Sequence, residues 1–437
     1  MEIYDKMMTS PHTRGDQDAN LCRKIEGRRL AGCLVTAPIW PDLLSLSPRA
    51  KASIAGIVGL LITLGIARFA YTPMLPIMRE QAGLGLGAGG WLATANYAGY
   101  FTGVFLCGRI SDLNLKDRLY RWGLILAVIS TAMMGMVSSE VGWAISRFLA
   151  GLSTAVGMML GGALVMNWLM RNGHRAELGA HFSGVGLSVV MSSFAVLTLS
   201  EHVLWSENWL FLSLLGLILV LPAWAWLPKP MPAPEVERES KMQDRPPTVA
   251  VRRLLLAFYF CAGVGFVVTS TFIVAIVNAL PEMQDVGFWV FVILGAAAAP
   301  SCMLWDLIAR RVGAIDALMI ASVLHIAGIL LPIAGGGLFG PIAGALCFGF
   351  TFAGIVSMMM GLAGRFYPTR PARMMSTLTI AYGIAQILAP ALTGWISERT
   401  GSYNAGLLAA AAVMTVGLVM LLLLRRLPLS INQQVTV

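Results

Sequence analysis

The feature that most constrains the fold of this chain is a series of long apolar runs separated by short polar connections. A helix needs about 20 residues to cross the hydrocarbon core of a bilayer, because each residue adds about 1.5 Å to its length. Twelve runs approach or exceed that length, and they lie near residues 52–76, 89–107, 119–138, 142–168, 178–199, 208–227, 254–278, 286–304, 315–335, 339–364, 374–396 and 405–424. The pattern predicts an all-α membrane protein with twelve transmembrane helices.

The composition agrees with a protein that is surrounded by lipid. Hydrophobic residues make up 57% of the chain and charged residues only 12%, whereas an average soluble domain has about 25% charged residues. The net charge of +9 arises largely from short basic clusters between the apolar runs. This arrangement is typical of membrane topology rather than of a phosphate-binding face, so we expect the lipid bilayer as a partner and no nucleic acid.

A polar stretch between Pro228 and Arg253 divides the apolar runs into two sets of six. It begins with a proline-rich segment and continues with interspersed acidic and basic side chains, a composition that cannot bury enough apolar surface to form a core. The chain is therefore predicted to contain a cytoplasmic N-terminal tail (1–51), a first six-helix bundle (52–227), a cytoplasmic linker (228–253), a second six-helix bundle (254–424) and a cytoplasmic tail (425–437).

Lys and Arg are concentrated in every second connection, and this bias predicts the orientation in the membrane. One set of connections carries Arg109, Lys116, Arg118, Arg121, Arg171, Arg175, Arg310, Arg311, Arg365, Arg370, Arg373, Arg425 and Arg426. The opposite loops hold only Arg79 and Arg399, together with several carboxylates. Because basic loops remain in the cytoplasm, both termini and the linker are predicted to be cytoplasmic, in a bacterial cytoplasmic (inner) membrane.

Two short motifs resemble signatures of the major facilitator superfamily of transporters. The connection after the second run reads Gly108-Arg-Ile-Ser-Asp112 and continues with basic residues that include Arg118. It is similar to the family's GxxxD loop followed by basic residues. The fourth run contains Arg147-Phe-Leu-Ala-Gly151, which resembles the family's RxxxG signature on that helix.

Two longer strings resemble one branch of that superfamily, the uncharacterised YbfB/YjiJ type. The first run reads Gly65-Ile-Ala-Arg-Phe-Ala-Tyr-Thr-Pro-Met-Leu-Pro76, and the eleventh reads Tyr382-Gly-Ile-Ala-Gln-Ile-Leu-Ala-Pro-Ala-Leu-Thr-Gly394. The resemblance covers roughly residues 52–425. It implies the major facilitator fold, in which two pseudo-symmetric six-helix bundles surround a central cavity.

The resemblance also implies a set of gating residues. In the family's loop signature the glycine lets two helix ends approach, and the aspartate caps a neighbouring helix and pairs with an arginine. These roles fall on Gly108, Asp112 and Arg118, while Gly151 matches the signature of the fourth helix and Pro390 marks a kink. The match is incomplete, because Leu115 replaces the second glycine of the signature and the corresponding second-half loop lacks both its glycine and its aspartate.

Arg68 and Arg147 are the most specific candidates for substrate binding, because each lies within an apolar run. An arginine at the centre of a span costs about 2.5–3.5 kcal/mol on insertion scales. Both are predicted about 8–12 Å below the outer surface, and the resemblance places their helices along the cavity. No run contains a mid-membrane Asp or Glu, so an anionic substrate is the predicted partner. The alternative is that each guanidinium bonds backbone carbonyls or extends to the surface.

Further polar residues on the predicted cavity helices complete the candidate binding site. A buried amide or hydroxyl needs a hydrogen-bond partner in space that excludes lipid, so these side chains are expected to face the substrate or one another. The full candidate set is Arg68, Tyr71, Asn96, Tyr97, Arg147, Asn278, Tyr382 and Gln386, with Tyr100 on the same helix as Tyr97.

The sequence favours a secondary active transporter that moves a small organic anion or zwitterion by alternating access. Two alternatives remain, namely proton-coupled efflux of hydrophobic compounds and a transporter-like receptor without transport. An enzyme is not expected, since the runs contain no His/Asp/Glu metal cluster and no Ser–His or paired-Asp site. We accordingly expect a small-molecule substrate and a monomer, with no catalytic residue, no metal site and no cofactor.

Overall fold

The computed structural model describes residues 46–172, 179–230, 244, 246–281, 283–367 and 372–427. Residues 49–437 form one compact unit, and the contacts given below lie within it. Helices are the only regular elements in the described residues, which confirms the all-α prediction. Most of the predicted tails and most of the linker at 228–253 lie outside these residues, so the domain boundaries stay a prediction.

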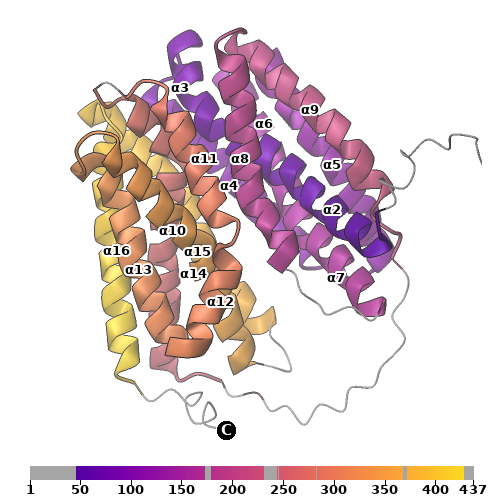
Figure 1. Cartoon of the computed structure of the whole chain (residues 1–437), viewed down its shortest axis with the longest axis vertical. Coiled ribbons are helices and arrows are strands. Elements are labelled where there is room, and N and C mark those ends of the chain that lie inside the picture. The colour runs from indigo at the N-terminus through magenta and orange to yellow at the C-terminus, as the bar shows by residue number, and fades with distance from the viewer. Residues whose placement is uncertain are drawn as a thin grey trace, which may run out of the picture. The chain divides into compact units, whose positions relative to one another are not determined.

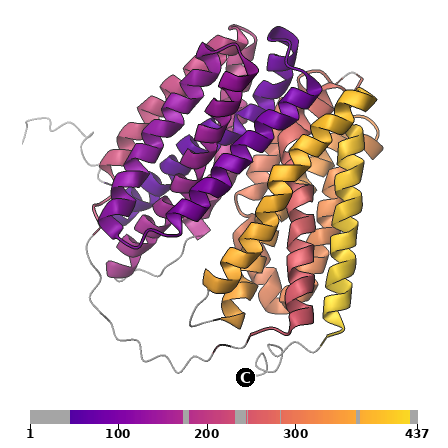
Figure 2. The same cartoon turned by 180° about the vertical axis from the view of Figure 1, so that it is seen from behind.

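Figures 1 and 2 show the helices from opposite sides, coloured along the chain. The first half contributes α2 (Pro48–Leu60), the π-helical segment η2 (Leu61–Phe69), α3 (Tyr71–Gln81), α4 (Leu86–Cys107), α5 (Leu113–Met136), α6 (Glu140–Ala155), the π-helical segment η3 (Val156–Gly161), α7 (Gly162–Arg171), α8 (Gly179–Ser200) and α9 (Trp205–Ala225). The second half contributes α10 (Val249–Asn278), α11 (Val286–Ala298), α12 (Ser301–Val312), α13 (Ala314–Ala334), α14 (Phe339–Phe366), α15 (Ala372–Thr400) and α16 (Asn404–Arg425).

Most of the predicted spans are helices that are long and apolar enough to cross a bilayer. Ten helices meet this description in the described residues, and an eleventh is obtained if α11 and α12 form one bent span. The remaining predicted span, near 89–107, corresponds to α4, which has 22 residues. Its several glycines, with Asn96 and two tyrosines, lower its mean hydropathy. If α11 and α12 form one span, twelve helical spans are long enough to cross a bilayer, but α4 is less apolar than the others, so the predicted count of twelve is met only in part.

Two spans depart from a straight α-helix. α11 and α12 meet at 48° beside Pro300, whose ring supplies no amide hydrogen to continue the helix. The sequence had indicated a single run at 286–304, and the proline explains the difference. In the first span the amide of Ala70 donates to the carbonyl of Gly65 at 2.8 Å, five residues earlier, at the end of η2. Such π-helical turns are frequent at functional sites.

Glycines allow the close contact between helices α4 and α6, which pack directly against each other. A Cβ atom added to Gly99 would clash with the carbonyl oxygen of Phe148, and one added to Gly151 would clash with that of Asn96. Helices in a bilayer have little hydrophobic drive to associate, because lipid tails are as apolar as their side chains. Close backbone approach therefore supplies the van der Waals contact that holds this pair together.

Four hydrogen bonds join the first half of the chain to the second in the described residues. Written from hydroxyl donor to carbonyl acceptor, they are Thr72 to Ser270 (2.8 Å), Thr94 to Ile387 (2.9 Å), Ser193 to Phe288 (2.8 Å) and Tyr403 to Leu86 (3.2 Å). By position along each helix, all four lie in the half nearer the turn between α3 and α4. We call this end of the helices the joined end.

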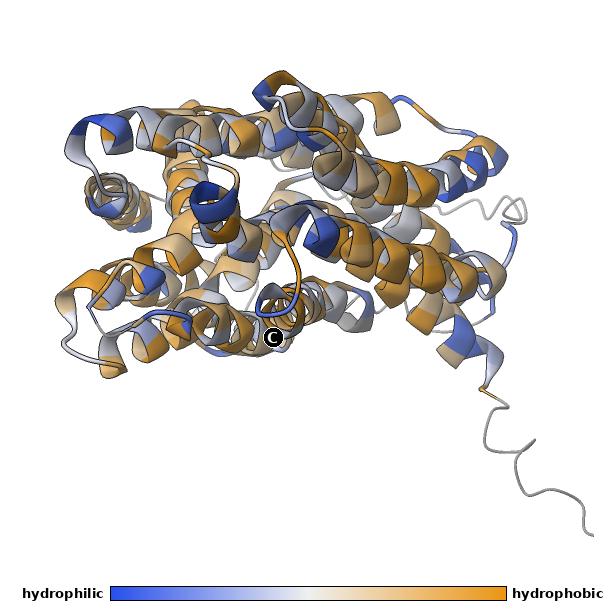
Figure 3. Cartoon of the chain, turned by 90° about the horizontal axis from the view of Figure 1, so that it is seen from above, coloured by the Kyte–Doolittle hydropathy of each residue, from blue (hydrophilic) through white to orange (hydrophobic). Residues whose placement is uncertain are grey.

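The outward surface of the helices carries large apolar side chains. Met136, Leu221 and Phe339 are exposed by 74%, 70% and 73%. Figure 3 shows hydrophobic residues along the flanks of the helices and hydrophilic ones mainly at helix ends and turns. A water-soluble monomer rarely exposes large contiguous apolar patches, so this surface fits contact with lipid tails.

We predict that Gly99→Ala destabilises the protein by about 2 kcal/mol, because the added methyl group overpacks the contact with the α6 backbone at Phe148. The measurement is thermal denaturation of the purified protein in detergent. Gly361→Ala in α14 is the matched control, since no atom lies within 4 Å of a Cβ at that position. Alanine there is expected to be neutral or stabilising, because of its higher helix propensity. Equal melting temperatures for the two variants would contradict the prediction.

Candidate functional site

The π-helical segment η2 ends at Phe69, and the backbone amide of Ala70, its C-cap, donates to the carbonyls of Gly65 and Arg68. Pro73 lies five residues after Arg68 and has no amide hydrogen, so it cannot complete the π-helical pattern at the Arg68 carbonyl. Arg147 of α6 reaches this point: its Nη1 donates to the carbonyl of Ala67 at 2.8 Å, and its Nη2 donates to that of Arg68 at 3.4 Å. The sequence left two alternatives for each arginine, binding of an anionic substrate or bonding to backbone carbonyls. Arg147 bonds backbone carbonyls.

Arg147 is almost completely enclosed, with 2% of its surface exposed. Its guanidinium lies 4.4 Å from the centroid of the Tyr71 ring, and the Tyr71 hydroxyl donates to the carbonyl of Gly89 at 2.8 Å. The Asn96 side chain donates from Nδ2 to the backbone carbonyl of Arg147 at 2.9 Å. Arg147 therefore links α6 to the first span and, through Tyr71 and Asn96, to α4.

Arg68 is buried too, but it has different neighbours. Its guanidinium carbon lies 4.3 Å from the ring centroid of Tyr97 and 4.8 Å from that of Tyr100. Its Nε is buried without a hydrogen-bond partner, and the ion pairs of the described residues do not include it. Arg68 is thus a buried cation stabilised by aromatic faces, with hydrogen-bonding capacity left unused.

A small cavity brings five of the predicted binding residues together. Arg68, Tyr71, Asn96, Tyr97 and Arg147 all line it. The second half contributes Ser270 and Thr271 of α10 to the same lining. The sequence does not single out these two residues, because a serine or threonine inside an apolar run is common and does not by itself indicate a binding site. In this conformation the cavity has room for roughly a single water molecule.

The other three predicted binding residues lie on the second half. Tyr382 of α15 is within electrostatic range of Arg68 and Tyr97. Gln386, one turn further along α15, is buried and its Oε1 has no partner. Asn278 lies apart from them at the end of α10, where its Oδ1 accepts a hydrogen bond from the amide of Gly287 at 2.8 Å, beside the start of α11.

The predicted gating residues fall into two groups. Asp112 is the N-cap of α5, accepting from the amides of Asn114 and Leu115 at 3.1 Å each. Gly108 has only carbonyls of its own helix near its Cβ position, and Arg118 is exposed. Gly151 and Pro390 instead mark close helix crossings: Gly151 meets α4, and the Pro390 carbonyl would clash with a Cβ on Gly90 of α4.

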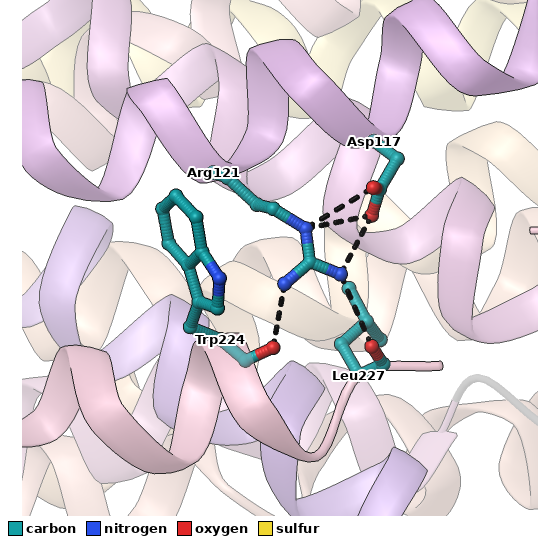
Figure 4. A network of polar contacts seen from close by, with 4 residues as sticks. All are labelled: Asp117, Arg121, Trp224 and Leu227. Carbon is teal, nitrogen blue, oxygen red and sulfur yellow. Dashed lines mark hydrogen bonds and ion pairs between the residues drawn. The ribbon is translucent and has the colours of Figure 1, made fainter. Parts of the chain in front are cut away.

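A charged network near the Asp112 loop was not anticipated as a unit from the sequence (Figure 4). Arg121 of α5 pairs with Asp117 one turn earlier, with Nη2 3.0 Å from Oδ1. The same guanidinium donates to the carbonyls of Trp224 at 2.6 Å and Leu227 at 3.2 Å, at the end of α9. A cation at a helix C-terminus bonds carbonyls that have no intrahelical partner, so Arg121 fastens α5 to α9.

Comparison with known proteins agrees with this architecture. The family described as "Uncharacterised MFS-type transporter YbfB", where MFS denotes the major facilitator superfamily, matches residues 60–422. The uncharacterised MFS-type transporter YceJ of Bacillus subtilis (strain 168) is 30% identical over 95 residues, which are 22% of this chain and 24% of that protein. The match thus spans about a quarter of the length of this relative.

Three solved transporters share the fold. The nucleoside transporter NupG has a TM-score of 0.67 at 14% identity, covering 88% of this chain and 100% of NupG. A bacterial homologue of the human lysosomal transporter Spinster has a TM-score of 0.64 at 15% identity, covering 87% and 98%. The human organic anion transporter MFSD10 has a TM-score of 0.57 at 16% identity, covering 86% and 100%. At such identities the likeness establishes the major facilitator fold alone.

The contrasting surroundings of the two arginines predict different effects on stability. Arg147→Gln is expected to lower the free energy of unfolding by about 2–3 kcal/mol, because two charge-assisted hydrogen bonds to buried carbonyls are lost. Arg68→Gln is expected to have a clearly smaller effect, since it removes ring contacts together with an unpaired buried charge. Thermal denaturation in detergent measures both, and a larger loss for Arg68→Gln would contradict the assignment.

Proposed function

The chain belongs to the family of the uncharacterised MFS-type transporter YbfB, and we propose that it moves a small organic anion or zwitterion by alternating access. Family membership and the solved relatives support membrane transport as the general activity. The observation that carries the finer proposal is Arg68, a guanidinium that is 7% exposed, lines the cavity and has no anionic partner among the described residues.

The electrostatics of the cavity favour a negative group. Arg147 lies within electrostatic range of Arg68, so two positive charges act on one enclosed space. Charges interact more strongly in a protein interior than in water, because the effective dielectric constant is lower. Carbonyl bonds offset part of the charge of Arg147, whereas no hydrogen bond or ion pair of the Arg68 guanidinium is found among the described residues and its Nε is unpaired. A bound carboxylate relieves this excess, and a cation in the same place increases it.

The joined end supports the alternating-access part of the proposal. The hydrogen bonds between the halves lie on the side of the α3–α4 turn, and the basic connections lie at the opposite helix ends. If the basic connections are cytoplasmic, this conformation is closed toward the outside and both termini are inside the cell. Transport then requires the joined end to open while the opposite end closes, with the substrate near the centre.

The solved relatives offer examples of substrate classes, and these are known only for the relatives themselves. MFSD10 is an organic anion transporter and NupG a nucleoside transporter. A shared fold supports many functions, so the anion proposal rests on Arg68 and the relatives supply only precedent.

We predict that ligand binding depends on Arg68. The purified protein is screened by thermal shift against organic monoanions, zwitterions and the hydrophobic cation tetraphenylphosphonium. A ligand at about 100 times its Kd stabilises the folded state by about 2.7 kcal/mol. At least one anion or zwitterion is expected to raise the melting temperature of the wild type and not that of Arg68→Gln. Uptake of the same ligand into proteoliposomes should fall at least about tenfold in this variant.

Arg79→Gln is the matched control for this screen. Arg79 also lies over an aromatic ring, with its guanidinium carbon 5.6 Å from the centroid of Tyr403, but it does not line the cavity. This variant should respond to the ligand as the wild type does. Stabilisation by tetraphenylphosphonium that survives Arg68→Gln, with no response to anions, would replace the proposal with efflux of hydrophobic cations.

Opening of the joined end is predicted to be essential for transport. Thr72→Cys combined with Ser270→Cys, in a chain whose native cysteines are replaced by serine, places a thiol pair where α3 meets α10. Oxidative cross-linking is expected to stop uptake, because the halves can no longer separate there, and reduction should restore it. Unchanged uptake by fully cross-linked protein would exclude movement at this end.

A further inference from the structure

Two tyrosines of the first half contact Arg68, and helix α15 brings two tyrosines of the second half near them, since Gly383, next to Tyr382, packs against the ring of Phe101, next to Tyr100. Tyr97 and Tyr100 of α4 present their ring faces to the guanidinium at 4.3 and 4.8 Å. Tyr382 of α15 is within electrostatic range of Arg68, Tyr97 and Tyr100, and Tyr259 of α10 is within range of Tyr100. One buried cation therefore lies among aromatic rings on the boundary between the halves.

The second-half tyrosines begin a stacked series of rings. The centroids of Tyr259 and Tyr382 are 4.5 Å apart, with an angle of 30° between the ring planes. Phe266 lies 6.1 Å from Tyr382 at 26°, and Phe352 lies 5.2 Å from Phe266 at 32°. We call these four residues the aromatic wall. Aromatic pairs favour offset-stacked and edge-to-face arrangements, so a further flat ring is well matched to this wall.

Polar groups beside the wall are left without partners. The hydroxyls of Tyr71 and Tyr403 donate to backbone carbonyls, whereas the hydrogen bonds found among the described residues do not include the hydroxyls of Tyr97, Tyr100, Tyr259 and Tyr382. The Nε of Arg68 and the Oε1 of Gln386 are buried and unpaired. Buried polar atoms are normally hydrogen-bonded, so unpaired ones call for a ligand or ordered water. The unpaired Nε of Arg68 is a charged donor, which is the kind of group that recognises a carboxylate.

We propose that the substrate is an aromatic carboxylate, an inference that rests on the anion transport proposed above and narrows it. The carboxylate pairs with Arg68, and the ring lies against Tyr259 and Tyr382. A guanidinium binds a carboxylate through two parallel hydrogen bonds, and Arg68 is already oriented by Tyr97 and Tyr100. Less conformational entropy is lost when the ligand binds to a group held in this way.

Simpler ligand classes satisfy only part of this arrangement. A small inorganic anion pairs with the charge of Arg68 but makes no ring contact with the aromatic wall. A neutral aromatic compound covers the wall but leaves the buried guanidinium without a counter-charge. The small cavity beside Ser270 holds roughly one water molecule, so the proposal assigns the ring to Tyr259 and Tyr382 and not to this cavity.

The proposal is tested by measuring, with calorimetry, the Kd of the purified full chain for a set of matched ligands. Phenylacetate and indole-3-acetate are the aromatic acids, cyclohexylacetate has the same charge on a saturated ring, and phenylacetamide is the neutral counterpart of phenylacetate. The wild type is expected to bind at least one aromatic acid threefold or more tighter than cyclohexylacetate, a difference of about the size that ring stacking provides. It should bind phenylacetamide about tenfold or more weakly than phenylacetate.

Two variants separate the roles of charge and ring. Arg68→Gln is expected to remove the preference for phenylacetate over phenylacetamide. Tyr382→Leu is expected to remove the preference for aromatic over saturated acids while binding of cyclohexylacetate persists. Tyr382→Phe keeps the ring and should retain the preference, which distinguishes loss of stacking from a damaged fold.

The outcomes separate this inference from the function on which it rests. If cyclohexylacetate binds the wild type as tightly as the aromatic acids, and does so through Arg68, anion transport stands and the aromatic assignment is wrong. If other anions bind through Arg68 and neither aromatic acid binds, the assignment is also wrong. If Arg68→Gln changes the binding of no anion, the anion proposal and this inference both fail.

Discussion

The hydrogen bonds from Arg147 to the first membrane span determine the geometry around which the rest of the site is built. Backbone carbonyls inside a bilayer need partners, and Pro73 removes one amide donor just beyond the end of η2. Arg147 adds side-chain hydrogen bonds to the carbonyls of Ala67 and Arg68 in this stretch. This fixes the backbone at Arg68 and leaves the Arg68 side chain directed to the rings of Tyr97 and Tyr100. One buried arginine thus bonds the backbone, while the other contacts aromatic rings and is the one proposed to bind a ligand.

Close helix packing explains how α4, the predicted span that falls short in apolarity, fits within the bundle. α4 packs against α6 through Gly99 and against α15 near Gly90. Contact with neighbouring helices replaces contact with lipid on these faces, so α4 needs less hydrophobic surface than a peripheral span. The same glycines bring Asn96, Tyr97 and Tyr100 close to the two arginines. Low hydropathy in α4 is therefore a consequence of its place between the halves.

The sequence was sufficient for the fold class, for most of the spans and for the family, because these depend on hydropathy and on local motifs. It also placed Arg68 and Arg147 at one depth, which follows from counting residues along two helices. It left open whether Arg147 bonds the backbone or a substrate, since this depends on the π-helical turn and on the rotation of α6. Asn278 was grouped with the cavity by its residue type, yet its position nine residues before Gly287 lets it cap a turn. Ser270, Thr271 and Tyr259 became visible only when α10 was packed against the first half.

A ligand that bridges the two halves provides the energy that alternating access needs. A ligand shifts a conformational equilibrium only by the difference between its affinities for the two states. In the proposed binding mode, charge recognition comes from Arg68 in the first half and ring contacts come from Tyr259 and Tyr382 in the second, so full binding would require a particular separation of the halves. A substrate that contacted one half alone would bind both states almost equally and move neither. The division of the site between the halves is thus the physical reason why a two-part ligand, charged at one end and flat at the other, suits this protein.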